Sequence, residues 1–171
     1  YPMDRYIMRR DFDDAVPALL GDRLHSCWAD TLDDCAPADD DTNYTVLALK
    51  LVKTYGPDFR PNDVLEGWLS WLPMFAACTA ERAAYRNAAM GMYAPETALF
   101  CNPYREWIGA QIRGDFFGYL NPGNPERAAE MAWRDASISH VKNGIYGEMF
   151  ASAMIAAAAS AGDTEEVIRA G

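Results

Sequence analysis

Three adjacent carboxylates, Asp39, Asp40 and Asp41, stand at the start of an apolar helical stretch and are followed by Thr42. Neighbouring carboxylates repel one another, whereas a hard cation such as Mg²⁺ takes carboxylate oxygens, waters and substrate oxygens as ligands. The alternative is helix capping, because Asp and Thr favour the N-cap position and negative charge stabilises a helix N-terminus. Capping is the simpler interpretation of the run alone, but it needs only one or two of the three carboxylates.

Further segments with polar and aromatic residues follow in a defined order. The run from Asp39 to Thr42 resembles the Thr-Asp-Asp-Thr metal motif of the ADP-ribosylglycohydrolase family, with Asp39 where the family often has Thr. The later segments resemble the same family, most closely its bacterial branches; they are Glu81 to Asn87, Asn102 to Arg113, Asn121 to Glu126 and Arg134 to His140. Ordered segments over most of the chain from Asp39 onward are more specific than any single motif.

The resemblance implies a metal site and a histidine near it. Asp40 and Asp41 match the two carboxylates of the family motif, and Asp39 replaces a Thr whose oxygen also faces the metal. His140 stands where the family has a histidine that lines the ribose and metal site; the alternative is a core histidine bonded to a neighbouring helix. We therefore predict Asp39, Asp40 and Asp41 as ligands of Mg²⁺, two ions in the complete protein, and Asp41 and His140 as catalytic residues.

The segment from Tyr104 to Arg113 matches a family loop and helix start that hold the diphosphate of ADP-ribose. Backbone N–H groups at a helix N-terminus form a natural anion site. This chain has bulky residues where the family has a small Gly-Ser type loop, while Gly109 and Arg113 keep their places. The alternative is a capped helix with Trp107, Ile108 and Ile112 facing the core, and both interpretations can hold together. The predicted substrate-binding residues are Tyr104, Arg105, Glu106, Trp107, Gly109 and His140.

Apolar residues recur at helical spacing through the rest of the chain, and no stretch alternates as a strand does. One helix from Tyr44 to Tyr55 ends at Gly56-Pro57, and a second, around Val64 to Leu72, ends at Pro73. Thr79 is predicted to cap a third helix. Asn followed by Pro predicts a helix start at Asn102 and again at Asn124. A further helix is predicted from Glu148 to Ala161, and a short one after the cap Asp163. Five aromatic residues are assigned to packing: Trp68, Trp71, Tyr85, Trp133 and Tyr146.

These elements predict an all-α fold, and the resemblance implies a compact multi-helix orthogonal bundle forming one domain over residues 1–171. Family members also carry a glycine-rich segment and a second acidic metal motif that we do not find here. We therefore expect the chain to be the N-terminal and central part of a longer domain. Its partner would be the remaining C-terminal part of the same domain, and the fragment alone would be inactive.

Composition limits the class of ligand and the compartment. The 171 residues carry a net charge of −10, which argues against binding of nucleic-acid backbones by basic patches. Cys27, Cys35, Cys78 and Cys101 lack the pattern of a small secreted disulfide protein, so we predict free, mostly buried thiols and a cytoplasmic location. No stretch is long and apolar enough to predict a membrane span.

The resemblance predicts a Mg²⁺-dependent hydrolase that cleaves an ADP-ribosyl bond, N- or O-glycosidic, through an oxocarbenium-like transition state. Its ligand would be ADP-ribose or an ADP-ribosylated substrate. Two alternatives remain open. The protein could be a non-catalytic ADP-ribose-binding or structural module on the same scaffold, as the Asp39 substitution and the bulky loop suggest. It could also hydrolyse another ribosyl N-glycoside, such as a free nucleoside.

Overall fold

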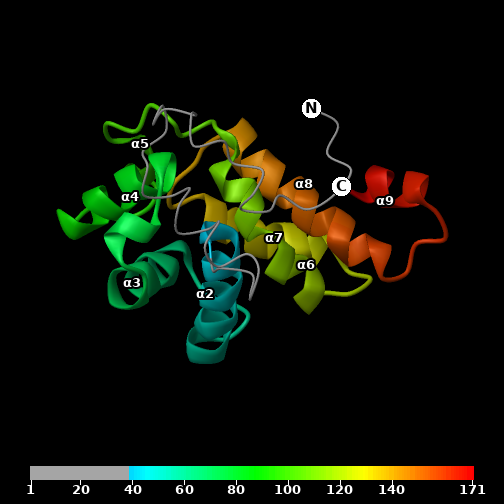
Figure 1. The fold of residues 1–171 in the computed structure, drawn as a ribbon. Coiled ribbons are helices and arrows are strands. Elements are labelled where there is room, and N and C mark those ends of the chain that lie inside the picture. Colours follow the sequence, from blue (N-terminus) through cyan, green and yellow to red (C-terminus); the bar gives the residue numbers. More distant parts are fainter. Residues whose placement is uncertain (1–38) are drawn as a thin grey trace, which may run out of the picture. The chain divides into compact units, whose positions relative to one another are not determined.

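The computed structural model describes residues 39–171, and over this range the chain forms helices and no strand. The predicted all-α class is confirmed. Figure 1 shows the arrangement, in which α8 runs beside α7 and α6. The α-helices are α2 (Asp40–Tyr55), α3 (Pro61–Trp71), α4 (Thr79–Ala89), α5 (Glu96–Leu99), α6 (Asp115–Leu120), α7 (Pro125–Ala136), α8 (Asn143–Ala158) and α9 (Thr164–Ala170), and the 3₁₀ helices are η2 (Met74–Ala76) and η3 (Ile108–Arg113).

Several helix ends follow the local chemistry of the sequence. Helix α2 ends before Gly56, whose φ of 82° lies in the left-handed region that glycine reaches without a Cβ clash. Helix α7 begins with Asn124 as its cap, since the side-chain oxygen accepts a hydrogen bond from the N–H of Arg127, and with Pro125 in the first turn. Asp163 caps α9 in the same way. These predicted boundaries are confirmed.

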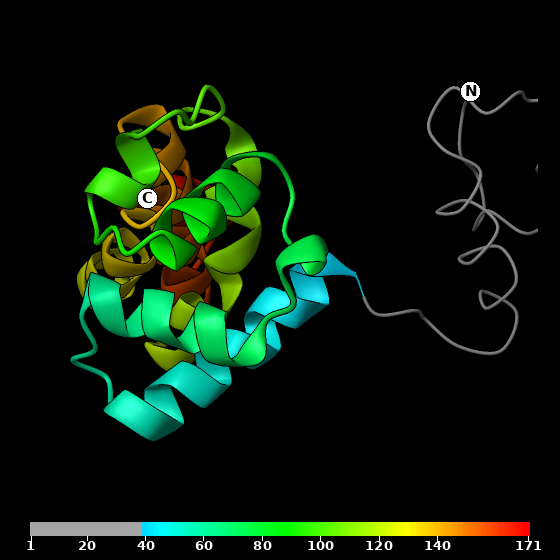
Figure 2. The ribbon, with the colours of Figure 1, turned by 90° about the vertical axis from the view of Figure 1, so that its left-hand side faces the viewer.

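The apolar core joins α2 and α3 to the central helices. Tyr44 of α2 and Trp68 of α3 are buried with their ring centroids 5.5 Å apart. Figure 2 shows α3 crossing α2, and this crossing places the first turn of α2 at one end of the core. Phe59 packs on Phe117 of α6, with 5.6 Å between the ring centroids. The core therefore fixes the direction in which α2 presents the Asp39–Asp41 run.

Helix α8 packs on its neighbours through small residues. Its buried positions include Ser152, Ala153, Ala156 and Ala157. A Cβ added at Gly118 of α6 would lie 2.5 Å from the Cβ of Ile155 and 2.8 Å from the carbonyl oxygen of Ser152, so the two backbones approach too closely for any side chain there. The close contact of α6 and α8 depends on this glycine.

Three predicted helix boundaries are wrong. Cys78, not Thr79, is the N-cap residue of α4, and no side chain caps that end. No helix starts at Asn102; its buried amide instead donates to the carbonyls of Ala80 and Ser139, and the next helix, η3, begins only at Ile108. Helix α8 starts at Asn143, five residues before the predicted Glu148, because its first residues, Asn143 and Gly144, gave no apolar signal of a helix.

The predicted burial of some side chains is also wrong. Trp107 and Ile108 are exposed, because residues 103–107 form turns rather than a helix that could face them inward. Trp133 and Tyr146 are exposed as well, on the outer faces of α7 and α8. Cys78 and Cys101 are free, as predicted, but exposed; Cys27 and Cys35 lie outside the described residues.

The described helices form one unit, Asp40–Gly171, and a single domain over residues 1–171 stays a prediction. Within the described range, no helix has the length and hydropathy that crossing a membrane requires.

Candidate functional site

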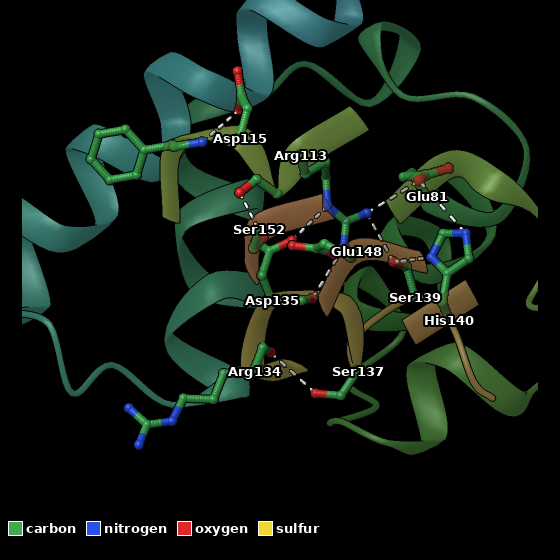
Figure 3. Close-up of polar contacts among 12 residues, drawn as sticks. Glu81, Arg113, Asp115, Arg134, Asp135, Ser137, Ser139, His140, Glu148 and Ser152 are labelled. Atoms are coloured by element: carbon green, nitrogen blue, oxygen red, sulfur yellow. Dashed lines mark hydrogen bonds and ion pairs between the residues drawn. The ribbon is translucent and has the colours of Figure 1, made fainter. Parts of the chain in front are cut away.

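A single buried arginine organises the polar centre of the molecule. Arg113, at the end of η3, has a side chain with only 2% of its surface exposed. Its Nε donates to Asp135 Oδ2 at 2.6 Å and its Nη1 donates to Glu81 Oε1 at 3.1 Å. Its guanidinium also lies 5.0 Å from the ring centroid of Trp68. Figure 3 shows these carboxylates converging on Arg113 from α4 and α7, with Glu148 approaching from α8. Burial by itself lowers the pKa of Arg113, but the neighbouring carboxylates, Asp135 first, more than offset this and raise it, so the guanidinium stays charged.

Glu81 connects this centre to the predicted metal run. Its side chain is buried, and burial is the first cause that raises its pKa; Arg113 acts in the opposite direction and Asp40 adds to the increase. The charge of Asp40 is thus felt at Glu81. A Cβ added at Gly109 would lie 2.3 Å from Glu81 Oε1, so Gly109 allows the loop before Arg113 to pass directly over this carboxylate.

His140 is completely enclosed. Its Nδ1 lies 2.8 Å from Ser139 Oγ, and its Nε2, which has no hydrogen-bond partner among residues 39–171, lies 3.8 Å from Glu81 Oε1. Burial, aided by the positive charge of Arg113, lowers the pKa of His140 to about 3. The imidazole is therefore neutral at physiological pH. Gly144 makes room for it, because a Cβ there would lie 2.7 Å from the ring.

Glu148 is the most isolated carboxyl of the centre. It is fully buried, and neither oxygen has a hydrogen-bond partner among the described residues. Its closest charge is Arg113, with 3.7 Å between Nη2 and Oε2, beyond hydrogen-bond distance. Burial and the neighbouring Asp135 raise the pKa of Glu148 well above its ordinary range. The surroundings of Glu148 therefore favour its neutral, protonated form.

The predicted metal ligands lie together at the first turn of α2. One carboxylate oxygen from each of Asp39, Asp40 and Asp41 can be chosen so that all three lie within 4.8 Å of one another. Asp39 and Asp40 are half-buried and Asp41 is exposed. Further along the helix, the Thr45 hydroxyl donates to Asp115, which holds this turn beside the start of α6. The oxygen-only donor set matches the preference of a hard divalent cation.

The predicted substrate loop, Tyr104 to Trp107, is held by a backbone hydrogen bond on one side and is exposed to solvent on the other. The carbonyl of Arg105 accepts a hydrogen bond from the N–H of Val141 at 2.8 Å, which ties the loop to the turn after His140. Glu106 lies 3.7 Å from Lys142 Nζ. Tyr104 meets Trp107 edge to face, with ring centroids 4.9 Å apart, and the indole of Trp107 is exposed.

The structure therefore brings some of the predicted residues together through a residue that sequence reasoning missed. Glu81 lies against Gly109 and faces His140. Arg113, Asp135 and Glu148 were also not predicted as site residues. The available signal was a charged residue inside an otherwise apolar helical stretch, as at Glu148.

A search of known protein families gives one match, to the ADP-ribosylglycohydrolase model, over residues 8–171. The match covers nearly the whole chain and includes all segments that build the site. The chain belongs to the ADP-ribosylglycohydrolase family. No curated protein and no solved structure matches it. Family membership indicates hydrolysis of a glycosidic bond and binding of an ADP-ribosylated substrate, in a family that is typically metal-dependent.

Proposed function

We propose that this ADP-ribosylglycohydrolase-family protein is a Mg²⁺-dependent hydrolase that cleaves an ADP-ribosyl bond. The observation that carries the proposal is the cluster of Asp39, Asp40 and Asp41 oxygens at the first turn of α2, in a chain that matches the ADP-ribosylglycohydrolase family. The donor set fits Mg²⁺, because all its atoms are carboxylate oxygens and waters can complete the coordination. Asp40 and Asp41 are the principal ligands in this proposal, and Asp39 supplies a third.

Each part of the site has a distinct role in the proposed reaction. Mg²⁺ held by the aspartates would orient the ribose hydroxyls and lower the pKa of a bound water. The carboxylates of Asp40 and Asp41 would place negative charge beside the ribose ring, which develops positive charge in an oxocarbenium-like transition state. Gly109 and the loop from Tyr104 to Trp107 hold the diphosphate. His140 is a neutral imidazole whose Nε2 lies 3.8 Å from Glu81 Oε1.

A second candidate is a non-catalytic module that binds ADP-ribose. The enclosure of His140 favours it, because a fully buried imidazole has no path to a ribose in this conformation. Turnover separates the two candidates: the hydrolase releases ADP-ribose from an ADP-ribosylated protein when Mg²⁺ is present, and the module binds ADP-ribose without turnover.

The first experiment measures melting temperature with EDTA, with Mg²⁺, and with Mg²⁺ plus ADP-ribose. A ligand at one hundred times its Kd stabilises the folded state by about 2.7 kcal/mol. We expect a shift that needs both additions and disappears in an Asp40→Asn/Asp41→Asn variant but persists in Glu126→Gln, an exposed acid on α7. A shift that persists in the double variant would place the ligand elsewhere. ADP-ribose release by the intact protein, and its absence in the double variant, would then establish hydrolysis.

A further inference from the structure

A hollow of about 650 Å³ opens on the outer face of α4, away from the buried centre. Thr79, Arg82 and Arg86 line it from the helix, and Cys101, Pro103 and Tyr104 line it from the following loop. Residues three and four apart on a helix are neighbours on one face, so the two guanidiniums lie on the same side of α4. The residue before Arg82 is Glu81, which points the other way into the centre.

Both guanidiniums are held in place by neutral oxygens. Arg82 Nε donates to the carbonyl of Ala77 at 2.7 Å, and its guanidinium lies 5.9 Å from the ring centroid of Phe75. Arg86 donates from Nε and Nη2 to Asn87 Oδ1 at 3.2 and 3.0 Å, and from Nη2 to the carbonyl of Cys101 at 3.2 Å. These bonds restrict side chains that would otherwise be mobile on the surface.

The anchor of Arg86 is part of the core. Asn87 is completely buried, and its amide nitrogen donates to the carbonyls of Thr97 and Phe100 at 2.9 and 2.7 Å. Its amide oxygen is therefore fixed toward Arg86. Two residues that line the hollow, Thr79 and Cys101, have positive φ of 33° and 45°, a conformation that side chains other than glycine adopt at a cost. The carbonyl of Cys101 is one of the oxygens that hold Arg86.

The charge of this pair is not neutralised within the described part of the chain. No carboxylate of residues 39–171 forms an ion pair with Arg82 or Arg86, although Arg113, Arg127, Arg134 and Arg169 each form at least one. The bonds of both side chains within this range use Nε and Nη2, which leaves the Nη1 donors for a ligand. Two ordered guanidiniums without a carboxylate partner form a local positive site on a protein whose net charge is −10. Such a site favours binding of an anion.

We propose that this hollow is a binding site for the phosphate group of a small phosphorylated ligand. Guanidinium forks bind phosphate through paired hydrogen bonds, and the hydroxyls of Thr79 and Tyr104 add donors. A phosphate group has enough oxygen atoms to accept hydrogen bonds from two guanidiniums and a hydroxyl. A single carboxylate has only two oxygen atoms. The proposal rests on Arg82 and Arg86, which have no role in the proposed hydrolysis; Tyr104 is the one lining residue shared with the loop proposed above to hold the diphosphate.

The test is titration calorimetry with inorganic pyrophosphate in EDTA buffer, with malonate as a dicarboxylate comparison. We expect pyrophosphate to bind the intact protein more tightly than malonate. Binding should weaken at least tenfold in Arg82→Gln/Arg86→Gln and stay within twofold in Arg169→Gln, a matched exposed arginine on α9. Equal loss, or equal retention, in the double variant and the Arg169 control would overturn the proposal, as would preference for malonate.

Two further measurements keep the result decisive. An Arg82→Lys/Arg86→Lys variant keeps the charge without the fork, so we expect it to lose most of the affinity; full affinity would show diffuse charge attraction and overturn a built site. If the glutamine variant fails to fold, the Nε–H NMR signals of the intact protein decide, because pyrophosphate should shift those of Arg82 and Arg86 selectively. Pyrophosphate binding should persist in Asp40→Asn/Asp41→Asn, which separates this site from the proposed metal site.

Discussion

Glu148 and Asp135 both lie against Arg113, yet we expect replacement of each by its amide to have very unequal effects on stability. Asp135 accepts a 2.6 Å hydrogen bond from Arg113, whereas the oxygens of Glu148 have no hydrogen-bond partner among the described residues. Glu148→Gln replaces a carboxyl whose neutral form is favoured by burial with a neutral amide of the same shape. Asp135→Asn removes the principal negative partner of a buried cation.

The magnitudes follow from this difference. Removing one partner of a buried ion pair costs roughly 3–5 kcal/mol, because the other charge stays buried without compensation. In a chain of this size, that loss lowers the melting temperature by roughly 6–20 °C. Glu148→Gln removes no hydrogen bond to the described residues, and the neutral form of Glu148 is already favoured, so we expect a change within about 1 kcal/mol.

The assay is urea unfolding of the intact protein and both variants across pH. The folded pKa of Glu148 is raised above its unfolded value, so its contribution to stability is present below the unfolded pKa, near 4.5, and is lost as pH rises through the folded pKa. Glu148→Gln should remove this loss and gain stability relative to the intact protein as pH rises. Destabilisation of Glu148→Gln as large as that of Asp135→Asn, at pH 7, would refute a protonated Glu148.

Three other perturbations test separate parts of the structure. Gly109→Ala should destabilise by about 1–3 kcal/mol, since its Cβ would lie 2.3 Å from Glu81 Oε1, whereas Gly147→Ala in α8, with no neighbour nearer than 3.4 Å, should not; equal effects in thermal melts would contradict the predicted clash. Asn124→Ala should cost about 1 kcal/mol in urea unfolding through loss of the α7 cap, and an unchanged midpoint would show that the cap is dispensable. The folded pKa of His140, about 3, is below its unfolded value, so its contribution is present above pH 6.5 and is lost as pH falls; His140→Asn should remove up to about 1.4 kcal/mol per pH unit of this slope, and an identical slope in the variant would mean that the imidazole is already charged.

Helix boundaries were predicted correctly from the sequence where they depend on residues within one turn of the boundary. Gly56, the Asn124-Pro125 pair and Asp163 act within one turn of the chain, so their effect is visible without a tertiary structure. Asn102 has the same local chemistry as Asn124 but is not a cap, because its amide bonds to Ala80 and Ser139, which are distant in sequence. Long-range hydrogen bonds of this kind override a local signal and leave no periodic trace.

The site also has one part that adjacent residues reveal and another that only the tertiary structure brings together. The Asp39–Asp41 run was visible because its residues are adjacent, and the structure keeps an oxygen from each within 4.8 Å of the others. Arg113 and its three carboxylates come from η3, α4, α7 and α8, so no spacing along the chain reveals them. Charged residues in buried helices are the trace that such a centre leaves in a sequence, and Glu148 among the apolar residues of α8 is the clearest example. The metal, substrate and catalytic roles predicted for individual residues stay predictions.

The small residues of α8 also affect the entropy of folding. Ala and Gly lose no rotamer freedom when buried, whereas each buried Met or Gln loses up to about 2 kcal/mol of side-chain entropy. Helix α8 therefore becomes ordered at little entropic cost beyond that of its backbone, with Ala153, Ala156 and Ala157 buried toward its neighbours. The larger apolar surfaces belong to those neighbours, such as Phe117 of α6 and Met131 of α7, both fully buried. The buried alanines of α8 thus lose little side-chain entropy on folding. The hydrophobic free energy that stabilises the assembled helices comes mainly from the larger side chains packed around α8.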